Sequence, residues 1–233
     1  MINTIVEFIK KELTGWKKTE IIGISFIFAI IIINAFVLND SKIAIISAFC
    51  GIMYTIIAGK GKISCYLFGL MGSGFYSYLA FKNGLYGNVA LYMGYYIPMQ
   101  ICGIFQWKKH LKKETNEIFK TKLSAKECIS VLLVSSVLCA ISIFILYYIE
   151  DTHPVIDGIV TSLSLAGMYL TVKRSIEQWI VWGAVNLLSL IMWILVIITG
   201  VKVYSTALMW FVYLILAVYF YIEWNKELST KNI

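Results

Sequence analysis

The sequence has little of what a water-soluble domain needs on its surface. Only 14% of the 233 residues are charged, two are proline and 60% are hydrophobic, with a mean hydropathy of +0.80. A soluble domain of this length must keep a wet exterior, so the composition excludes one. A bilayer core about 30 Å thick needs roughly 20 apolar residues per helix. The chain therefore has room for about seven or eight crossings and for no separate catalytic domain.

Acidic side chains are missing from the interior of the apolar blocks. The 13 Asp and Glu residues lie in loops or near block ends, and Asp157 and Glu223 reach furthest inward. Proton-driven carriers keep an ionisable residue in the membrane for the relay, so this absence argues against energy coupling. Both histidines, His110 and His153, lie in loops. Because no cluster of His, Asp and Glu comes within reach by helical spacing, we expect the protein not to be an enzyme.

Signals for metals, disulfides, phosphates and nucleic acids are also lacking. The five cysteines have no paired spacing, so we interpret them as small buried hydrophobic residues and expect no metal site. The glycine–lysine turn at 59–62 lacks the spacing of a phosphate-binding loop, and no cofactor is expected. The net charge of +7 comes from short lysine clusters between apolar blocks, which is typical of topology signals and not of nucleic-acid binding.

Eight apolar blocks bounded by polar residues make up most of the chain. Backbone groups in hydrocarbon must be satisfied within their own segment, so we expect each block to be a helix. The blocks cover residues 21–38, 43–59, 63–81, 86–107, 128–149, 155–172, 176–198 and 203–224. The sequence thus predicts an all-α integral membrane protein with eight transmembrane helices.

The basic residues indicate how these helices are oriented. With the N-terminus in the cytoplasm and eight crossings, only Lys42, Lys82 and Lys202 of the 20 basic residues fall on the other side. Such asymmetry is a positive-inside signal, so we expect both termini to be cytoplasmic. The first 19 residues mix apolar side chains with Lys and Glu, which indicates a helix lying on the membrane surface and not a cleavable signal peptide.

The second half of the chain resembles the first. Three residue pairs recur at a spacing of 116 or 117: Gly84 with Gly200, Tyr66 with Trp182, and Trp107 with Trp224. Helices two to four then match helices six to eight, and the fifth helix links them. A three-helix unit ends on the opposite side from where it began, so the linker makes the two halves run in parallel. The alternative is that apolar helices resemble one another through composition alone.

Polar and aromatic side chains share one face of several predicted helices, at 100° per residue. Trp and Tyr favour membrane interfaces, so Trp16, Trp107 and Trp224 are interpreted first as belt residues. Trp182 lies deeper, and Asn186 lies one turn deeper still. An amide at that depth either joins helices or contacts a ligand. Because it accompanies a tryptophan stripe and is expected to face Gln100 of the other repeat, we favour ligand contact.

The predicted binding site is uncharged and rich in aromatic rings. Its residues are Trp182, Asn186, Gln100, Trp179, Tyr96, Tyr66, Ser73 and Trp107. Aromatic faces attract cations by roughly 1–2 kcal/mol when desolvated, and amides can bind a carboxamide or ribose hydroxyls. The site therefore suits a small molecule with a flat ring, and a cationic ring in particular. A membrane enzyme or signalling protein would need a catalytic cluster, and a structural scaffold would leave the matched polar stripes unexplained.

Four stretches together resemble the PnuC-type vitamin transporter family over about residues 43–226. They are 173–186, which contains Trp182-x-x-x-Asn186; 157–165 (DGIVTSLSL); 62–70; and 100–107, which ends in Gly103-x-x-x-Trp107. The resemblance implies a three-plus-one-plus-three fold akin to the SWEET type, with one additional N-terminal helix. It also implies uptake of nicotinamide riboside by facilitated diffusion through a bacterial-type inner membrane, with a cytoplasmic kinase trapping the product.

The resemblance also implies residue roles and leaves the cargo open. Trp182 and Trp179 would stack on the substrate ring, while Asn186 and Gln100 would bind its polar substituents. Some relatives carry Asn where this chain has Gln100, and relatives of similar fold carry thiamine, riboflavin or deoxynucleosides. A homo-oligomer is left open. The predicted organisation is an N-terminal segment at 1–19, an additional helix at 20–42, a first repeat at 43–107, a basic loop and linker helix at 108–153, a second repeat at 154–225 and a tail at 226–233.

Overall fold

The computed structural model describes residues 7, 10–12, 14–38, 42–82, 86–150, 153–198, 200 and 204–230. All regular structure in these ranges is helical, apart from isolated β-bridges, so the prediction of an all-α fold is confirmed. The elements are α2 (Lys18–Leu38), α3 (Lys42–Gly59), α4 (Cys65–Lys82), α5 (Tyr86–Leu91), the π-helix η1 (Tyr92–Tyr96), α6 (Ile97–Lys108), α7 (Ala125–Tyr148), α8 (Pro154–Val172), α9 (Glu177–Ile198) and α10 (Tyr204–Thr230).

Two of the predicted helices differ in detail from the structure. The block at 86–107 contains the π-helical turn η1, in which the Ile97 N–H bonds to the Tyr92 carbonyl, and Pro98 follows directly. Proline has no N–H, so a wider turn before it disturbs fewer hydrogen bonds. The last helix continues past Trp224 to Thr230. An apolar run indicates where a helix lies in lipid, whereas the helix itself ends where backbone bonding stops.

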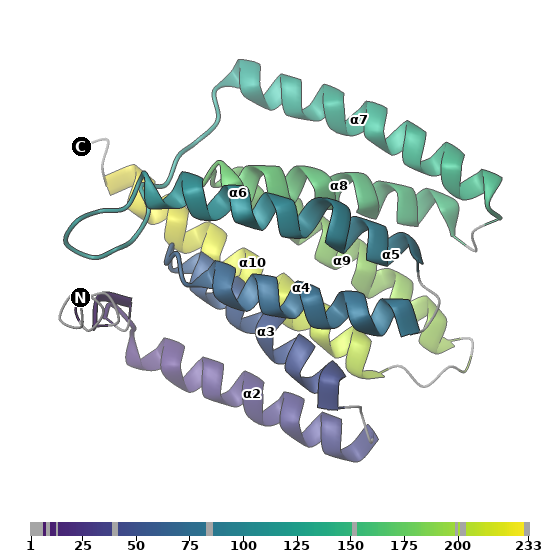
Figure 1. Ribbon diagram of the computed structural model, residues 1–233, viewed down its shortest axis with the longest axis horizontal. Helices are drawn as coiled ribbons and strands as arrows, with labels where there is room; N and C mark the ends of the chain where they lie inside the picture. The colour runs from purple at the N-terminus through teal and green to yellow at the C-terminus, as the bar shows by residue number, and fades with distance from the viewer. Residues whose placement is uncertain are drawn as a thin grey trace. The chain divides into compact units, whose positions relative to one another are not determined.

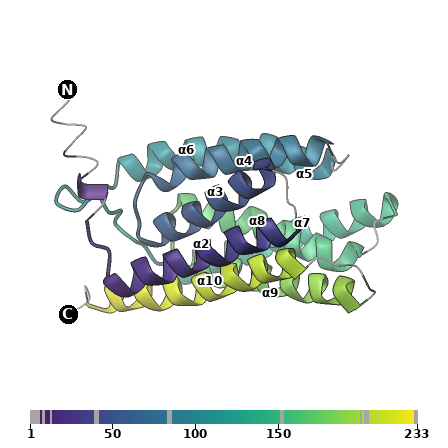
Figure 2. The ribbon, with the colours of Figure 1, turned by 90° about the horizontal axis from the view of Figure 1, so that it is seen from below.

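The chain divides into two compact units, residues 1–119 and 120–233. In the first unit α3 packs on α4, which lies along α5, η1 and α6, while α2 contacts α3 (Figures 1 and 2). In the second unit α7 packs on α8, α8 on α9, and α9 on α10 (Figure 1). The predicted linker helix α7 thus belongs to the second unit.

Apolar side chains cover the outside of these units. Within the described residues, α7, α8, α9 from Glu177 to Leu195 and α10 from Ala207 to Thr230 are long and apolar enough to cross a membrane. No residue in the most apolar stretch of α7 is buried, and Leu132, Val137 and Phe144 are exposed on this helix. A helix that is apolar all round and yet uncovered needs lipid as its solvent.

The α3–α4 turn and the α8–α9 turn have the same backbone hydrogen bonds. The Gly61 N–H bonds to the Ala58 carbonyl as the Arg174 N–H bonds to the Thr171 carbonyl, at 2.8 and 2.9 Å. Further bonds in the two turns match with the same spacing of 113 residues: Lys62 to Ile57 with Ser175 to Leu170, Cys65 to Lys62 with Gln178 to Ser175, and Tyr66 to Ile63 with Trp179 to Ile176. Gly61 and Arg174 both have positive φ, 69° and 61°. The two turns therefore share one local design.

This match corrects the register that we expected from the sequence. At this spacing Tyr66 aligns with Trp179 and not with Trp182, which lies about one helical turn further on. The spacing changes from 113 to 117 by the end of each unit, because α9 has 22 residues and α4 has 18. An alignment of the two halves at one spacing of 116 residues does not show this added turn. The predicted turn at Gly84 lies outside the described residues, whereas Gly200 has a φ of 96°.

The first part of the basic loop is bound to the α3–α4 turn through Lys62. This side chain is 1% exposed, and its amine donates to the carbonyls of Lys11 and Thr115 at 2.7 and 2.8 Å. Glu117 lies 3.8 Å from the same amine. Burial lowers the pKa of Lys62, and the Glu117 carboxylate opposes that effect. The described part of the N-terminal segment is thereby held against the protein itself, while its predicted position on the membrane surface stays a prediction.

The second part of the loop is bound to the equivalent turn of the second unit. The Thr121 N–H bonds to the Arg174 carbonyl, and the Ile176 N–H bonds to the Thr121 carbonyl, both at 2.9 Å. The Glu177 carboxylate accepts the Leu123 N–H at 3.2 Å. Each half of the loop thus fixes the start of a helix that carries candidate site residues, α4 in the first unit and α9 in the second.

Candidate functional site

Gln100 and Ser73, both predicted site residues, contact each other in the first unit. The Gln100 Nε2 donates to the Ser73 Oγ at 2.9 Å, and the two residues are only 4% and 5% exposed. The other amide atom, Oε1, is buried and has no hydrogen-bond partner among the described residues. A buried acceptor without a partner is uncommon in folded proteins and calls for an explanation.

Tyr96 belongs to a group of tyrosines around the π-helical turn. Its ring lies 4.8 Å from that of Tyr92, measured between centroids, in an edge-to-face arrangement. Tyr92 in turn lies 4.4 Å from Tyr76 of α4. Helical turns of this wide kind often occur at functional sites. Helical periodicity identified Tyr96, whereas the π-helical turn before Pro98 is seen only in the structure.

Tyr66 and Trp107 form a packing pair in the first unit. Both are fully buried, with ring centroids 5.0 Å apart in an edge-to-face contact. Gly103 makes the contact possible, because a Cβ there would lie 2.3 Å from the Tyr66 ring. The interpretation of Trp107 as an interfacial belt residue is therefore wrong, and it is wrong for the fully buried Trp224 as well. Both rings pack inside their units instead of facing headgroups.

Trp182 packs flat against α8 in the second unit. A Cβ built on Gly167 would lie 2.9 to 3.1 Å from three atoms of the indole, so the ring face rests on the glycine. The indole N–H donates to the Thr171 Oγ1 at 3.1 Å. In the first unit the glycine and the aromatic ring are exchanged between the two helices. There the ring belongs to Tyr54 of α3, and it lies against Gly69 of α4. Gly167 and Thr171 were not among the predicted site residues, because only the fold brings them to Trp182.

Asn186 is buried, at 6% exposed, and aligns with Ser73 of the first unit at the spacing of 113 residues that the two turns share. Within the part of the chain that the structure describes, its side chain has no recorded hydrogen bond. Ser189, less than one turn further on, is also buried. An amide at this depth that is not used to join helices is available to a ligand. The expected approach of Asn186 to Gln100 stays a prediction.

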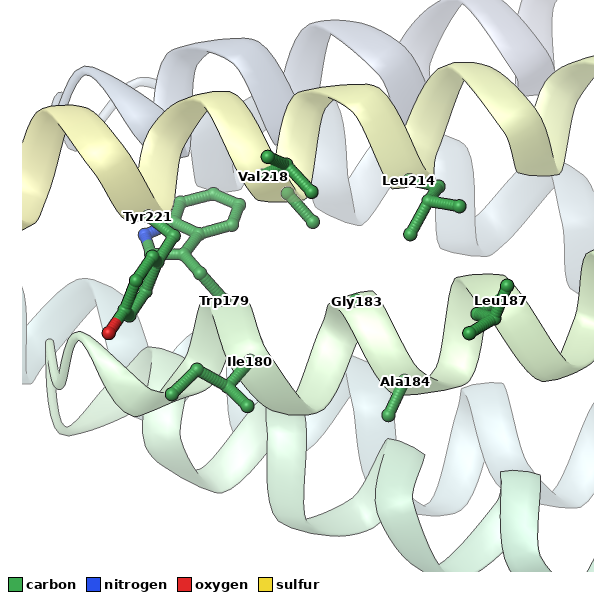
Figure 3. Close-up of a pocket in the computed structure, with 9 residues that line it drawn as sticks. Trp179, Ile180, Gly183, Ala184, Leu187, Leu214, Val218 and Tyr221 are labelled. Atoms are coloured by element: carbon green, nitrogen blue, oxygen red, sulfur yellow. The ribbon is translucent and has the colours of Figure 1, made fainter.

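Trp179 contacts α10, on a different side of α9 from the contacts of Trp182. Its ring centroid lies 5.2 Å from that of Phe220 and 5.7 Å from that of Trp224. It also borders a groove of about 310 Å³ between α9 and α10 (Figure 3). The remaining lining is Ile180, Gly183, Ala184, Leu187, Leu214, Ala217, Val218 and Tyr221. This lining is almost wholly apolar and contains no other predicted site residue, so the groove lacks the polar groups that orient a ligand.

The chemistry that these side chains offer is neutral. The two most intrusive carboxylates are Asp157, in the first turn of α8, and Glu223, about two turns before the end of α10 and 3.4 Å from Lys226. Among the described residues no group of three or more His, Cys, Asp or Glu could hold a metal ion. Cys50 and Cys65 are buried as expected, whereas Cys102 is exposed. The site residues can stack on rings and form neutral hydrogen bonds.

Comparison with known proteins gives one consistent family. The family described as nicotinamide mononucleotide transporter matches residues 41–226. A relative from Neisseria mucosa, named nicotinamide riboside transporter PnuC, is 33% identical over 93% of this chain and 85% of its own length. A relative of the same name from Haemophilus influenzae is 29% identical over 98% of this chain and all of its own length.

A solved structure has the same fold. The crystal structure of the vitamin B3 transporter PnuC matches with a TM-score of 0.81 and 31% identity, covering 94% of this chain and 96% of that one. The match extends well beyond the four motif stretches, so the similarity is one of the whole chain and not of isolated motifs. With the uncovered apolar helices described above, it shows a multi-pass membrane protein.

Proposed function

Because the chain belongs to the nicotinamide mononucleotide transporter family, we propose that it carries nicotinamide riboside across a bacterial inner membrane by facilitated diffusion. The observation that carries this proposal is the neutral character of its buried amides. Gln100 presents an unpartnered acceptor, and Asn186 has no recorded hydrogen bond in the described residues. Such groups suit the carboxamide and the ribose hydroxyls of a nucleoside with a cationic ring.

The site favours the riboside over the mononucleotide. A mononucleotide adds a phosphate, which proteins bind with Arg, Lys or helix N-termini. None of the predicted site residues is basic, and the nearby basic residues Lys62, Lys108, Lys173 and Arg174 lie at turns and helix ends. A buried phosphate with no such partner would be costly to desolvate.

We assign the two amides and one indole to substrate contact. Gln100 and Asn186 bind polar substituents, while Trp182 supplies a ring face and Tyr96 a second aromatic group. Tyr66, Trp107 and Trp179 support these residues by packing. The first unit thus offers an amide with a tyrosine, and the second offers an amide with a tryptophan.

The proposed architecture has eight transmembrane helices in a three-plus-one-plus-three order, with α2 as the additional helix and both termini in the cytoplasm. The matched turns before α4 and α9 support the internal repeat. The lysine distribution supports the orientation. Cysteine labelling of single-cysteine variants with a membrane-impermeant reagent tests the orientation, since reagent added outside should modify a residue placed at 200 and spare one placed at 60.

Transport is proposed to need no ion gradient, because the site residues contain no ionisable relay. A cytoplasmic kinase would then trap the product. Flux of nicotinamide riboside into sealed liposomes should approach equal concentrations on both sides without a gradient. Flux that requires a proton or sodium gradient would contradict facilitated diffusion.

Isothermal titration calorimetry on the purified protein tests the cargo. Nicotinamide riboside should give a saturable heat, and Asn186→Ala and Trp182→Ala should each weaken binding by about tenfold, which is about 1.4 kcal/mol. Leu187→Ala is the matched control, because this exposed side chain neighbours Asn186 on the same helix. Thiamine, riboflavin and a deoxynucleoside complete the panel. If one of them binds and nicotinamide riboside does not, the cargo assignment is wrong.

A further inference from the structure

Gln100 has an asymmetric environment that bears on which ligands it can bind. Its amide nitrogen is engaged by Ser73 at 2.9 Å, while its carbonyl oxygen is buried without a partner in the described part of the chain. Gly69 leaves the room that this oxygen occupies, since a Cβ there would lie 2.9 Å from it. The amide is therefore held in one orientation by neighbours on α4.

An amide side chain can present either a donor or an acceptor, depending on how it is turned. The Ser73 hydroxyl removes that freedom by accepting a hydrogen bond from Nε2. What remains for a ligand is the Oε1 acceptor. This acceptor can bond to an N–H or O–H of the ligand, including the neutral donors of a carboxamide or a hydroxyl, and it disfavours an anion, which brings only acceptors.

We propose that Ser73 is a positioning residue that fixes Gln100 as a hydrogen-bond acceptor and thereby selects substrates that present a neutral donor. The inference rests on the proposed function. In nicotinamide riboside the donor is an N–H of the carboxamide or an O–H of the ribose. The acid analogue, nicotinic acid riboside, replaces the carboxamide by a carboxylate with no donor at neutral pH.

Among its described residues, the second unit has no counterpart of the Ser73–Gln100 pair. The position equivalent to Ser73 is Asn186, by the spacing of 113 set at the α8–α9 turn, and the position equivalent to Gln100 is Ala217, by the spacing of 117 set at Trp107 and Trp224. Ala217 carries no group that could orient an amide. Asn186 is thus free to offer either its donor or its acceptor, whereas Gln100 is restricted to one. We therefore assign to the first unit the discrimination between a ligand with a hydrogen-bond donor and an anionic ligand.

The test compares the affinities of two ligands in matched variants. The full-length protein in detergent is titrated with nicotinamide riboside and with nicotinic acid riboside, and the ratio of the two dissociation constants is measured. Ser73→Ala removes the acceptor for Nε2. Ser77→Ala is the control, because Ser77 is also a buried serine of α4 but donates only to the Ser73 backbone carbonyl, at 2.8 Å.

The wild type and Ser77→Ala should prefer the carboxamide by about tenfold or more, as expected for one well-placed hydrogen bond. Ser73→Ala should reduce the ratio to about threefold or less, because the amide can then turn its NH₂ group toward the carboxylate. A nicotinamide riboside analogue without the 2′ and 3′ hydroxyls identifies the source of the donor. If Ser73→Ala changes the preference against this analogue and not the preference against the acid, the donor is a ribose hydroxyl.

Separate outcomes contradict the inference and the proposed function. In one outcome, Ser73→Ala binds nicotinamide riboside with unchanged preference over both the acid and the analogue without hydroxyls. That result overturns the positioning role of Ser73 and leaves the proposed function intact. A wild type that prefers the acid shows that the amide NH₂ faces the ligand, which also overturns it. A wild type that binds neither riboside contradicts the proposed function and removes the inference with it.

Discussion

Substitution of Gly167 by alanine tests how closely Trp182 is packed against α8. The added Cβ would lie 2.9 Å from Cε2 and 3.1 Å from Cδ2 and Cζ2 of the indole. Ordinary contacts of this kind are 3.4 to 4 Å, so the ring must retreat by about half an ångström. The indole N–H then moves away from the Thr171 Oγ1, which it contacts at 3.1 Å.

The expected cost combines overpacking with the loss of that hydrogen bond. Overpacking a close contact costs about 1–3 kcal/mol, and a neutral hydrogen bond contributes about 1 kcal/mol. Alanine also forms helix more readily than glycine, which returns up to about 1 kcal/mol. We therefore expect Gly167→Ala to destabilise the protein by about 2 kcal/mol and to weaken binding of nicotinamide riboside by about tenfold, because the ring face is displaced.

The matched control is Gly183→Ala, which makes the same chemical change beside Trp182 on α9. A Cβ at Gly183 meets nothing within 4 Å. Both variants gain the same helix propensity, so the difference between them reports the contact with the indole. Thermal unfolding in detergent and calorimetric binding should place Gly183→Ala at or above wild type and Gly167→Ala below it. Equal stability and equal affinity for the two variants would refute the packing argument.

Two further substitutions test the supporting structure of the first unit. Lys62→Met should free the loop at 108–119, because the Lys11 and Thr115 carbonyls lose their buried donor at a cost of about 1–3 kcal/mol each. Limited proteolysis should cut this loop sooner than in Lys112→Met, which removes the half-buried ion pair between Lys112 and Glu117. Resistance equal to wild type would show that Lys62 does not hold the loop. Gly103→Ala should cost more than Gly167→Ala, since its Cβ would lie 2.3 Å from the Tyr66 ring; a wild-type melting temperature would contradict that contact.

The positions of the helices followed from the sequence because they depend on short-range chemistry. Apolar runs bounded by lysines and turns require helices in lipid, and α3, α8 and α9 begin and end within about two residues of the predicted blocks. The absence of carboxylates from the interior of the apolar blocks was also visible in the sequence, because it depends only on which residue stands at each position. Pro98 was a visible irregularity, but whether it would kink the helix or follow a wide turn depended on its neighbours.

The candidate site was only partly predictable for the same reason. Helical periodicity identified Ser73 and Gln100 as inward-facing on separate helices, but their hydrogen bond depends on how α4 and α6 pack. Periodicity also grouped Trp179 with Trp182, which the structure places against different helices. A helical wheel gives the direction of a side chain and does not say which neighbour it meets.

The sequence by itself determined that this chain is helical, apolar and without inward charge, because each of these is a property of single residues and their spacing. Its motifs also identified the family. Only the tertiary structure decided the register of the two halves, since one added turn in α9 shifts the spacing and is invisible without the bonds that align the two turns. The tertiary structure also determined that the Gln100 amide nitrogen bonds to Ser73, because the orientation of an amide is set by the partner packed beside it.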